Sequence, residues 1–183
     1  MIEFLKTLFL GYEPKPTEVP QQGQLPFQPV FAQYQRHGGV PVELLQRGWM
    51  PHQFGITPVV IALPPQFRVR FAADGTLEAH HDVPQPVLTA KLHGGFEGNP
   101  LLALEFVADQ AQQRRVAFHD VGPYRCYYDP TAADPYAVAL RDFVVALPGA
   151  IVVLSLWGTR EQAATPLLSE VRQMVPHLIG SLV

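Results

Sequence analysis

Residues 67–80 read FRVRFAADGTLEAH, which is two alternating segments joined by a turn. Strict alternation of apolar and polar side chains is typical of a β-strand with one buried face. A three-residue turn with its glycine in the left-handed region aligns Phe71 with Leu77, whereas a two-residue turn would place Phe71 opposite a charged residue. The sequence therefore predicts an antiparallel hairpin in which Arg70 pairs with Glu78 on a solvated face.

Further short segments with strand character lie on both sides of this hairpin. Residues 57–63 are apolar and β-branched, and residues 87–93 alternate. Residues 101–107, LLALEFV, also alternate, and two more strands are expected at residues 115–121 and 124–128. The sequence thus predicts a largely antiparallel sheet of five to seven strands.

The apolar spacing changes to that of helices in the C-terminal third. Residues 131–147 carry apolar side chains at helical spacing and predict one helix, and residues 167–179 predict an amphipathic helix that begins at Thr165 and Pro166. Between them, residues 150–157 are almost continuously apolar, which is typical of a central strand covered on both faces. The sequence therefore predicts an α+β fold, with the sheet packed by two C-terminal helices.

The order of elements over residues 134–183 resembles the Mog1/PsbP-like architecture, in which a meander precedes a helix, an apolar strand and a terminal amphipathic helix. The resemblance covers element order in the C-terminal third and includes no diagnostic motif. Members of that group are mostly non-catalytic accessory or binding proteins. The resemblance therefore implies a binding role and carries over no functional residue.

The first 29 residues differ in composition from the rest of the chain. Four apolar residues share one face at helical spacing: Phe4, Leu5, Leu8 and Phe9. Residues 13–29 interleave proline with glutamine, which favours an extended polyproline-like arm. We therefore predict an N-terminal helix and a Pro/Gln-rich arm over residues 1–29, and one α+β domain over residues 30–183. The apolar helix face is expected to dock on the chain itself, on a second copy or on a protein partner.

Composition narrows the classes of function. Lys and Arg number 13 and Asp and Glu 16, giving a formal net charge of −3, so the protein has little positive field with which to attract nucleic acid. No apolar run reaches the ~18 residues of a membrane span, and an acidic residue, Glu3, lies where a signal peptide needs positive charge. The single cysteine excludes an intramolecular disulfide. Together these features predict a cytoplasmic protein without a transmembrane segment.

Histidines near the hairpins are candidate zinc ligands: His80, His81 and His93. His80 and His81 are neighbours in an extended segment, so their side chains should point to opposite faces. At ~3.3 Å per residue, His93 should lie roughly 20 Å from His81 along the next hairpin. We therefore expect structural histidines and no cofactor.

Cys126 would be a nucleophile if a histidine activated it. It lies in a predicted strand with Tyr128 on its own face and Tyr127 on the other, where a lone cysteine is usually buried and inert. His119 and Asp120 are adjacent strand residues that point apart, so they do not form a catalytic pair. The glycine-rich segment 93–100 is expected to be a hairpin turn that leads into a strand, without the helix N-terminus that a phosphate site needs.

Three aromatic residues of the predicted domain are of the type favoured at contact surfaces: Trp49, Tyr127 and Tyr128. With the apolar face of the N-terminal helix, they are the partner-binding candidates. We predict a non-enzymatic binding or protein–protein interaction domain. Two alternatives stay open, namely a small-molecule carrier with an apolar cavity between sheet and helices, and a small hydrolase or metal enzyme that uses histidine and Cys126.

Overall fold

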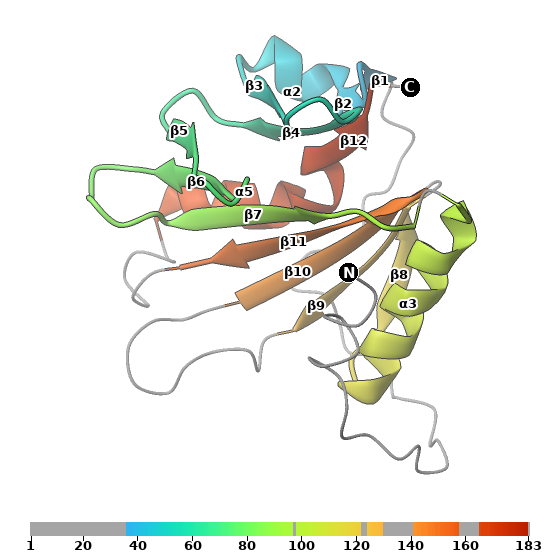
Figure 1. The fold of residues 1–183 in the computed structure, drawn as a ribbon. Helices are drawn as coiled ribbons and strands as arrows, with labels where there is room; N and C mark the ends of the chain where they lie inside the picture. The colour runs from blue at the N-terminus through green and yellow to red at the C-terminus, as the bar shows by residue number, and fades with distance from the viewer. Residues whose placement is uncertain (1–35, 97, 122–123, 130–140, 158–164, 183) are drawn as a thin grey trace.

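The computed structural model describes residues 36–96, 98–121, 124–129, 141–157 and 165–182. The predicted N-terminal helix and Pro/Gln-rich arm, residues 1–29, lie outside these ranges. The described elements form an α+β fold, as predicted, with antiparallel sheets and few helices (Figure 1). In the described ranges, no helix has the length and apolar character needed to cross a membrane.

A seven-stranded antiparallel sheet forms the centre of the fold. Its strands follow the order β5-β6-β7-β11-β10-β9-β8. In chain order they are β5 Arg68–Phe71, β6 Leu77–His80, β7 Leu88–His93, β8 Phe118–Val121, β9 Tyr124–Asp129, β10 Arg141–Leu147 and β11 Ala150–Leu156. The apolar strand β11 lies in the middle, as its composition predicts for a strand covered on both faces.

The β5–β6 hairpin has the predicted register. Phe71 pairs with Leu77, and Arg70 pairs with Glu78. The turn glycine, Gly75, has a φ of 80°, the left-handed conformation that the three-residue turn requires. The Arg70 Nε atom lies 2.6 Å from Oε2 of Glu78, which confirms the predicted cross-strand ion pair.

A smaller sheet joins distant parts of the chain. It has the order β12-β4-β3, with β3 Met50–Gln53, β4 Val59–Leu63 and β12 Ile179–Ser181. A two-stranded hairpin of β1 Arg36–His37 and β2 Val40–Pro41 leads into the short helix α2 Val42–Gln46 beside it. Gly39 in this hairpin contacts Gly180 of β12 so closely that a Cβ at Gly180 would overlap the backbone of Gly39.

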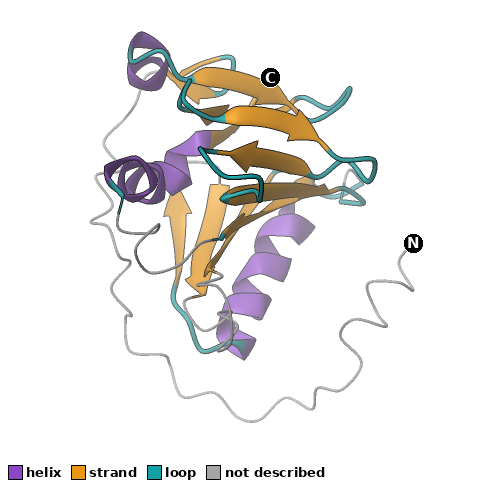
Figure 2. Ribbon diagram, turned by 90° about the vertical axis from the view of Figure 1, so that its left-hand side faces the viewer, coloured by secondary structure: helices purple, strands orange, loops and turns teal. Residues whose placement is uncertain are grey.

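Two apolar cores lie on opposite faces of the seven-stranded sheet, and Figure 2 shows helices on both sides of this sheet. The larger core joins this sheet to the smaller sheet and to α5 Pro166–Leu178, which begins where predicted. The Thr165 side chain caps its first turn by accepting the N–H of Leu168. The smaller core lies beneath α3 Pro100–Gln113 and contains seven buried residues: Ala103, Val107, Ala111, Tyr127, Val144, Ala146 and Ile151.

The predicted strand at residues 101–107 is wrong, because these residues belong to helix α3. Asn99 caps the helix by accepting the N–H of Leu101, and a proline occupies the first helical position. The buried residues Ala103 and Val107 are four apart, as on one helix face, whereas Leu101 is 61% exposed. The glycine-rich segment before Asn99 therefore leads into a helix, contrary to the expected hairpin turn.

The predicted helix at residues 131–147 is also wrong over its described part, since residues 141–147 form strand β10. Residues 130–140 lie outside the described ranges. Phe143 and Val145 face the larger core while Val144 and Ala146 face the smaller one, so apolar side chains occupy consecutive positions. The element order that carried the resemblance to Mog1/PsbP-like proteins is consequently not the order found between Arg141 and Leu147.

Candidate functional site

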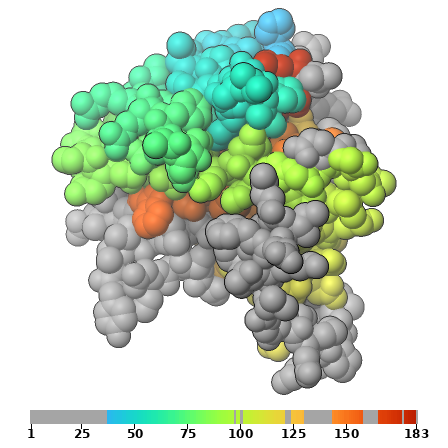
Figure 3. Space-filling model, in the orientation of Figure 1, coloured from blue at the N-terminus to red at the C-terminus, as the bar shows by residue number. Residues whose placement is uncertain are grey.

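One face of the seven-stranded sheet is covered over only part of its width. Helix α3 packs on β8 to β11. The register pairs His93 with Ile151 of the smaller core, so β7 and its neighbours direct their polar side chains to this same face. We call these residues the polar face: Arg68, Arg70, Glu78, His80, Thr89, Lys91 and His93. The strands that carry it extend away from α3 (Figure 1) and form a continuous surface at one end of the molecule (Figure 3).

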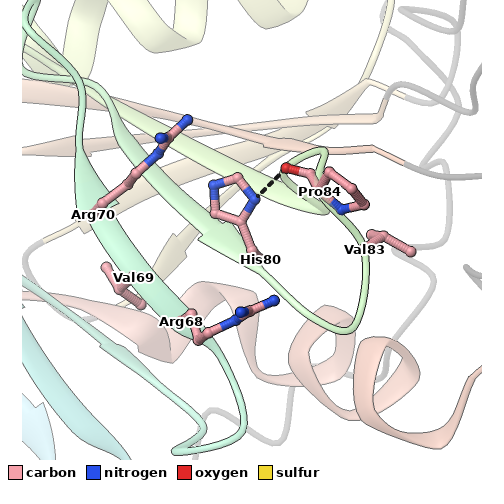
Figure 4. A pocket seen from close by; sticks show the side chains of 6 residues that line it. All are labelled: Arg68, Val69, Arg70, His80, Val83 and Pro84. Atoms are coloured by element: carbon pink, nitrogen blue, oxygen red, sulfur yellow. Dashed lines mark hydrogen bonds between the residues drawn. The ribbon is translucent and has the colours of Figure 1, made fainter.

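An open pocket lies at the β5 edge of the polar face (Figure 4). Its volume is about 300 Å³. The residues that line it are Arg68, Val69, Arg70, His80, Val83 and Pro84. Alternation along β5 places both arginines on one face, and the β6–β7 loop folds back to add an apolar wall.

His80 is the most enclosed polar residue of this pocket, with 9% of its surface exposed. Its Nδ1 atom lies 2.8 Å from the carbonyl oxygen of Pro84. Because a carbonyl only accepts hydrogen bonds, Nδ1 donates in this arrangement, and Nε2 presents a lone pair whenever the ring is neutral. Nε2 is buried without a hydrogen-bond partner among the described residues, and Oε2 of Glu78 lies 3.5 Å away, beyond hydrogen-bond distance.

The charges of the polar face are unevenly matched. Arg70 is paired with Glu78, and Nζ of Lys91 lies 2.8 Å from Oδ2 of Asp74. The hydrogen bond from Lys91, followed by those from Thr76, holds the pKa of Asp74 well below its ordinary value. The guanidinium of Arg68 has no ion pair or hydrogen bond within the described ranges, so it supplies the unmatched positive charge.

The three metal-ligand candidates lie in separate environments. His80 lines the pocket, whereas the ring of His81 packs edge-on against Phe67 of the larger core at 5.8 Å between centroids. His93 is half-buried, and burial, followed by the charge of Lys91, lowers its pKa. No three histidine, cysteine or acidic side chains of the described segments lie close enough to share a metal ion.

The aromatic partner-binding candidates contribute to the cores. Trp49 is 4% exposed in the larger core, and Tyr127 is 4% exposed in the smaller one. Tyr128 is half-buried and stacks on Phe143, with 4.6 Å between ring centroids. The four N-terminal candidates, Phe4, Leu5, Leu8 and Phe9, lie outside the described residues.

Cys126 lies directly opposite His119 in the β8–β9 pairing. The sequence relates His119 only to its neighbour Asp120, because the cross-strand pair depends on the β8–β9 register. Burial, with a contribution from the charge of Asp120, raises the pKa of the Cys126 thiol to about 12. The thiol is therefore protonated near neutral pH and is a weak nucleophile.

The pocket itself was not predicted. In the sequence His80 stands out only as a candidate zinc ligand, and Arg68 and Arg70 only as alternating polar residues. The return of the β6–β7 loop places Pro84 beside His80. Comparison with known proteins adds no assignment, because no protein-family model matches this chain and no curated protein is significantly similar to it.

Proposed function

We propose that this protein is a non-enzymatic binding or protein–protein interaction domain, and that it binds through the polar face. One observation carries the proposal. Helix α3 covers the sheet over β8 to β11, while β5 to β7 present an ordered polar surface with a pocket at its edge. A pocket with a few convergent polar groups is typical of recognition sites.

Two observations favour binding over a hydrolase that uses Cys126. The thiol stays protonated because its pKa is raised to about 12. The pocket, which contains His80, is formed by β5, β6 and the loop after β6, whereas Cys126 lies on β9, across β7, β11 and β10 from β6 in the sheet order. Cys126 and the pocket histidine, His80, therefore occupy different parts of the sheet.

The lining of the pocket favours surface recognition over the alternative of an apolar carrier. A carrier of apolar molecules would enclose a cavity between sheet and helices. This pocket is open, lies at the sheet edge, and combines two arginines and a histidine with the apolar residues Val69, Val83 and Pro84. Its chemistry suits a polar ligand or the polar group of a partner.

The binding surface can be tested by protein-observed NMR on the ¹⁵N-labelled full chain with a library of small polar molecules. Chemical-shift changes should cluster at Arg68, Thr89 and Lys91 and leave Phe118 on the opposite sheet edge unchanged. Spectra of the added molecules, recorded over hours, should show no conversion. Changes clustered away from the polar face, or turnover of an added molecule, would contradict the proposal.

The N-terminal arm remains part of this proposal as a docking segment for the chain itself, a second copy or a protein partner. Deleting residues 1–29 should lower the mass measured by light scattering if the arm joins two copies, or lower the melting temperature if it docks on its own chain. Retention of the mass, the melting temperature and the capture of any identified partner would reject the docking role.

A further inference from the structure

The pocket contains a buried acceptor that needs a hydrogen-bond donor. Nδ1 of His80 donates to the carbonyl of Pro84 (Figure 4), while Nε2 is buried without a hydrogen-bond partner among the described residues, 3.5 Å from Oε2 of Glu78. When the His80 ring is neutral, Nε2 and the Glu78 carboxylate are two acceptors 3.5 Å apart, which repel each other unless a proton lies near them. A ligand hydroxyl or N–H group at this point would supply the proton, because a buried acceptor without a partner raises the free energy of the unoccupied site.

The same pocket contains an unmatched cation. Arg68 pairs in register with His80 across the two strands, so its guanidinium and the imidazole lie on one face. Glu78 engages Arg70, which leaves about one positive charge to attract a ligand. A planar guanidinium binds a carboxylate through two parallel hydrogen bonds, and the nearby Glu78 carboxylate disfavours a doubly charged phosphate.

Taken together, these features lead us to propose that the pocket binds a small hydroxy-carboxylate. Its carboxylate pairs with Arg68 and its hydroxyl donates to Nε2 of His80, while its carbon chain contacts Val83 and Pro84. A volume of about 300 Å³ accommodates a molecule of this size. This inference rests on the proposed binding function and specifies its ligand class.

Three probes of similar shape separate the two interactions. Lactate has both the carboxylate and the hydroxyl, propionate lacks the hydroxyl, and lactamide lacks the charge. NMR titration of the full chain should show that propionate binds roughly tenfold more weakly than lactate, as expected for one lost hydrogen bond. Lactamide should bind roughly 10- to 100-fold more weakly, since it loses a charged pair. Inorganic phosphate serves as the test of the charge argument and should bind more weakly than lactate.

Two variants assign the contacts to residues. Arg68→Ala should weaken lactate and propionate binding alike. His80→Asn keeps an N–H group near the position of Nδ1 but removes Nε2, so lactate should bind only as well as propionate does. Arg115→Ala removes an exposed arginine on the α3 side of the molecule and should leave all affinities unchanged.

The outcomes separate this inference from the proposed function. Equal affinity for lactate and propionate, stronger binding of phosphate, or binding that Arg68→Ala leaves intact would overturn the ligand assignment, while the polar face could still bind other molecules in the library. Turnover of lactate would overturn the non-enzymatic function but leave the pocket assignment standing. If His80→Asn does not fold, the wild-type comparison of lactate with propionate and the Arg68→Ala variant still decide the inference.

Discussion

The two halves of one sheet face differ in what lies over them. Over β9 to β11, α3 presents the small residues Ala103 and Ala111, which let the helix approach the sheet closely above Ala146. Over β5 to β7 the same face carries long charged side chains such as Arg70 and Lys91, which would hold a helix away. One sheet thus combines a packed structural half with an open polar half, and the side chains on the strands determine which half is which.

The largest effect is expected from a charge placed under α3. Val144→Asp puts a carboxylate into the smaller core, where it has no partner, and should lower the free energy of unfolding by about 4 kcal/mol or more. His93→Asp makes the comparable change on the polar face, where solvent and Lys91 accommodate the charge, and should shift stability by less than about 1 kcal/mol. Urea denaturation measures both, and similar losses for the two variants would refute the division of the sheet.

A smaller but substantial effect is expected where α3 ends. Nη1 of Arg114 lies 2.6 Å from Oδ2 of Asp129, whose side chain is only 2% exposed. Arg114→Ala leaves that carboxylate buried without this partner and should destabilise the fold by about 3 kcal/mol, at the low end for buried pairs because Arg114 is partly exposed. Arg125→Ala, which breaks an exposed pair with Asp120, is the matched control and should cost about 1 kcal/mol or less. Equal losses would show that α3 does not depend on its buried ion pair.

The smallest effect concerns pH on the polar face. Burial, then the charge of Lys91, lowers the pKa of His93 below 6.5. The folded chain therefore binds this proton less readily than the unfolded chain does. The contribution of neutral His93 to the free energy of unfolding is complete above pH 6.5 and is lost as the pH falls through the lower pKa of the folded state. His93→Gln should remove a dependence of less than about 1 kcal/mol. NMR titration of the ring should give a midpoint below 6.5, and an ordinary midpoint would refute the partial burial of this side chain.

Local rules were sufficient for the hairpin, β11 and the start of α5. The turn glycine and the alternation around it determined the register, and Thr165 followed by Pro166 marked a helix start that the structure contains. In each case the signal lies within a few residues of the element that it predicts.

The two wrong assignments have different physical causes. In α3 the buried face consists of small residues such as Ala103, while the large residue Leu101 is exposed. The large apolar residues therefore follow the alternation of a strand and hide the helical spacing of the buried ones. In β10 both faces are buried, and a strand of that kind has no alternation to detect. The pocket could not be predicted because it depends on how the β6–β7 loop returns to His80, which no local pattern encodes.

The contact between Gly39 and Gly180 ties the beginning of the described chain to its end, and it constrains the order in which the protein can be assembled. All residues of strand β4 are buried. Its partner strand β12 lies at the other end of the described chain, so β4 can pair with it only after most of the chain has been made. During synthesis or refolding, the β4 edge next to that missing strand therefore stays open, and an unpaired apolar edge is a template for aggregation. A truncation that removes residues 179–181 would make this transient hazard permanent.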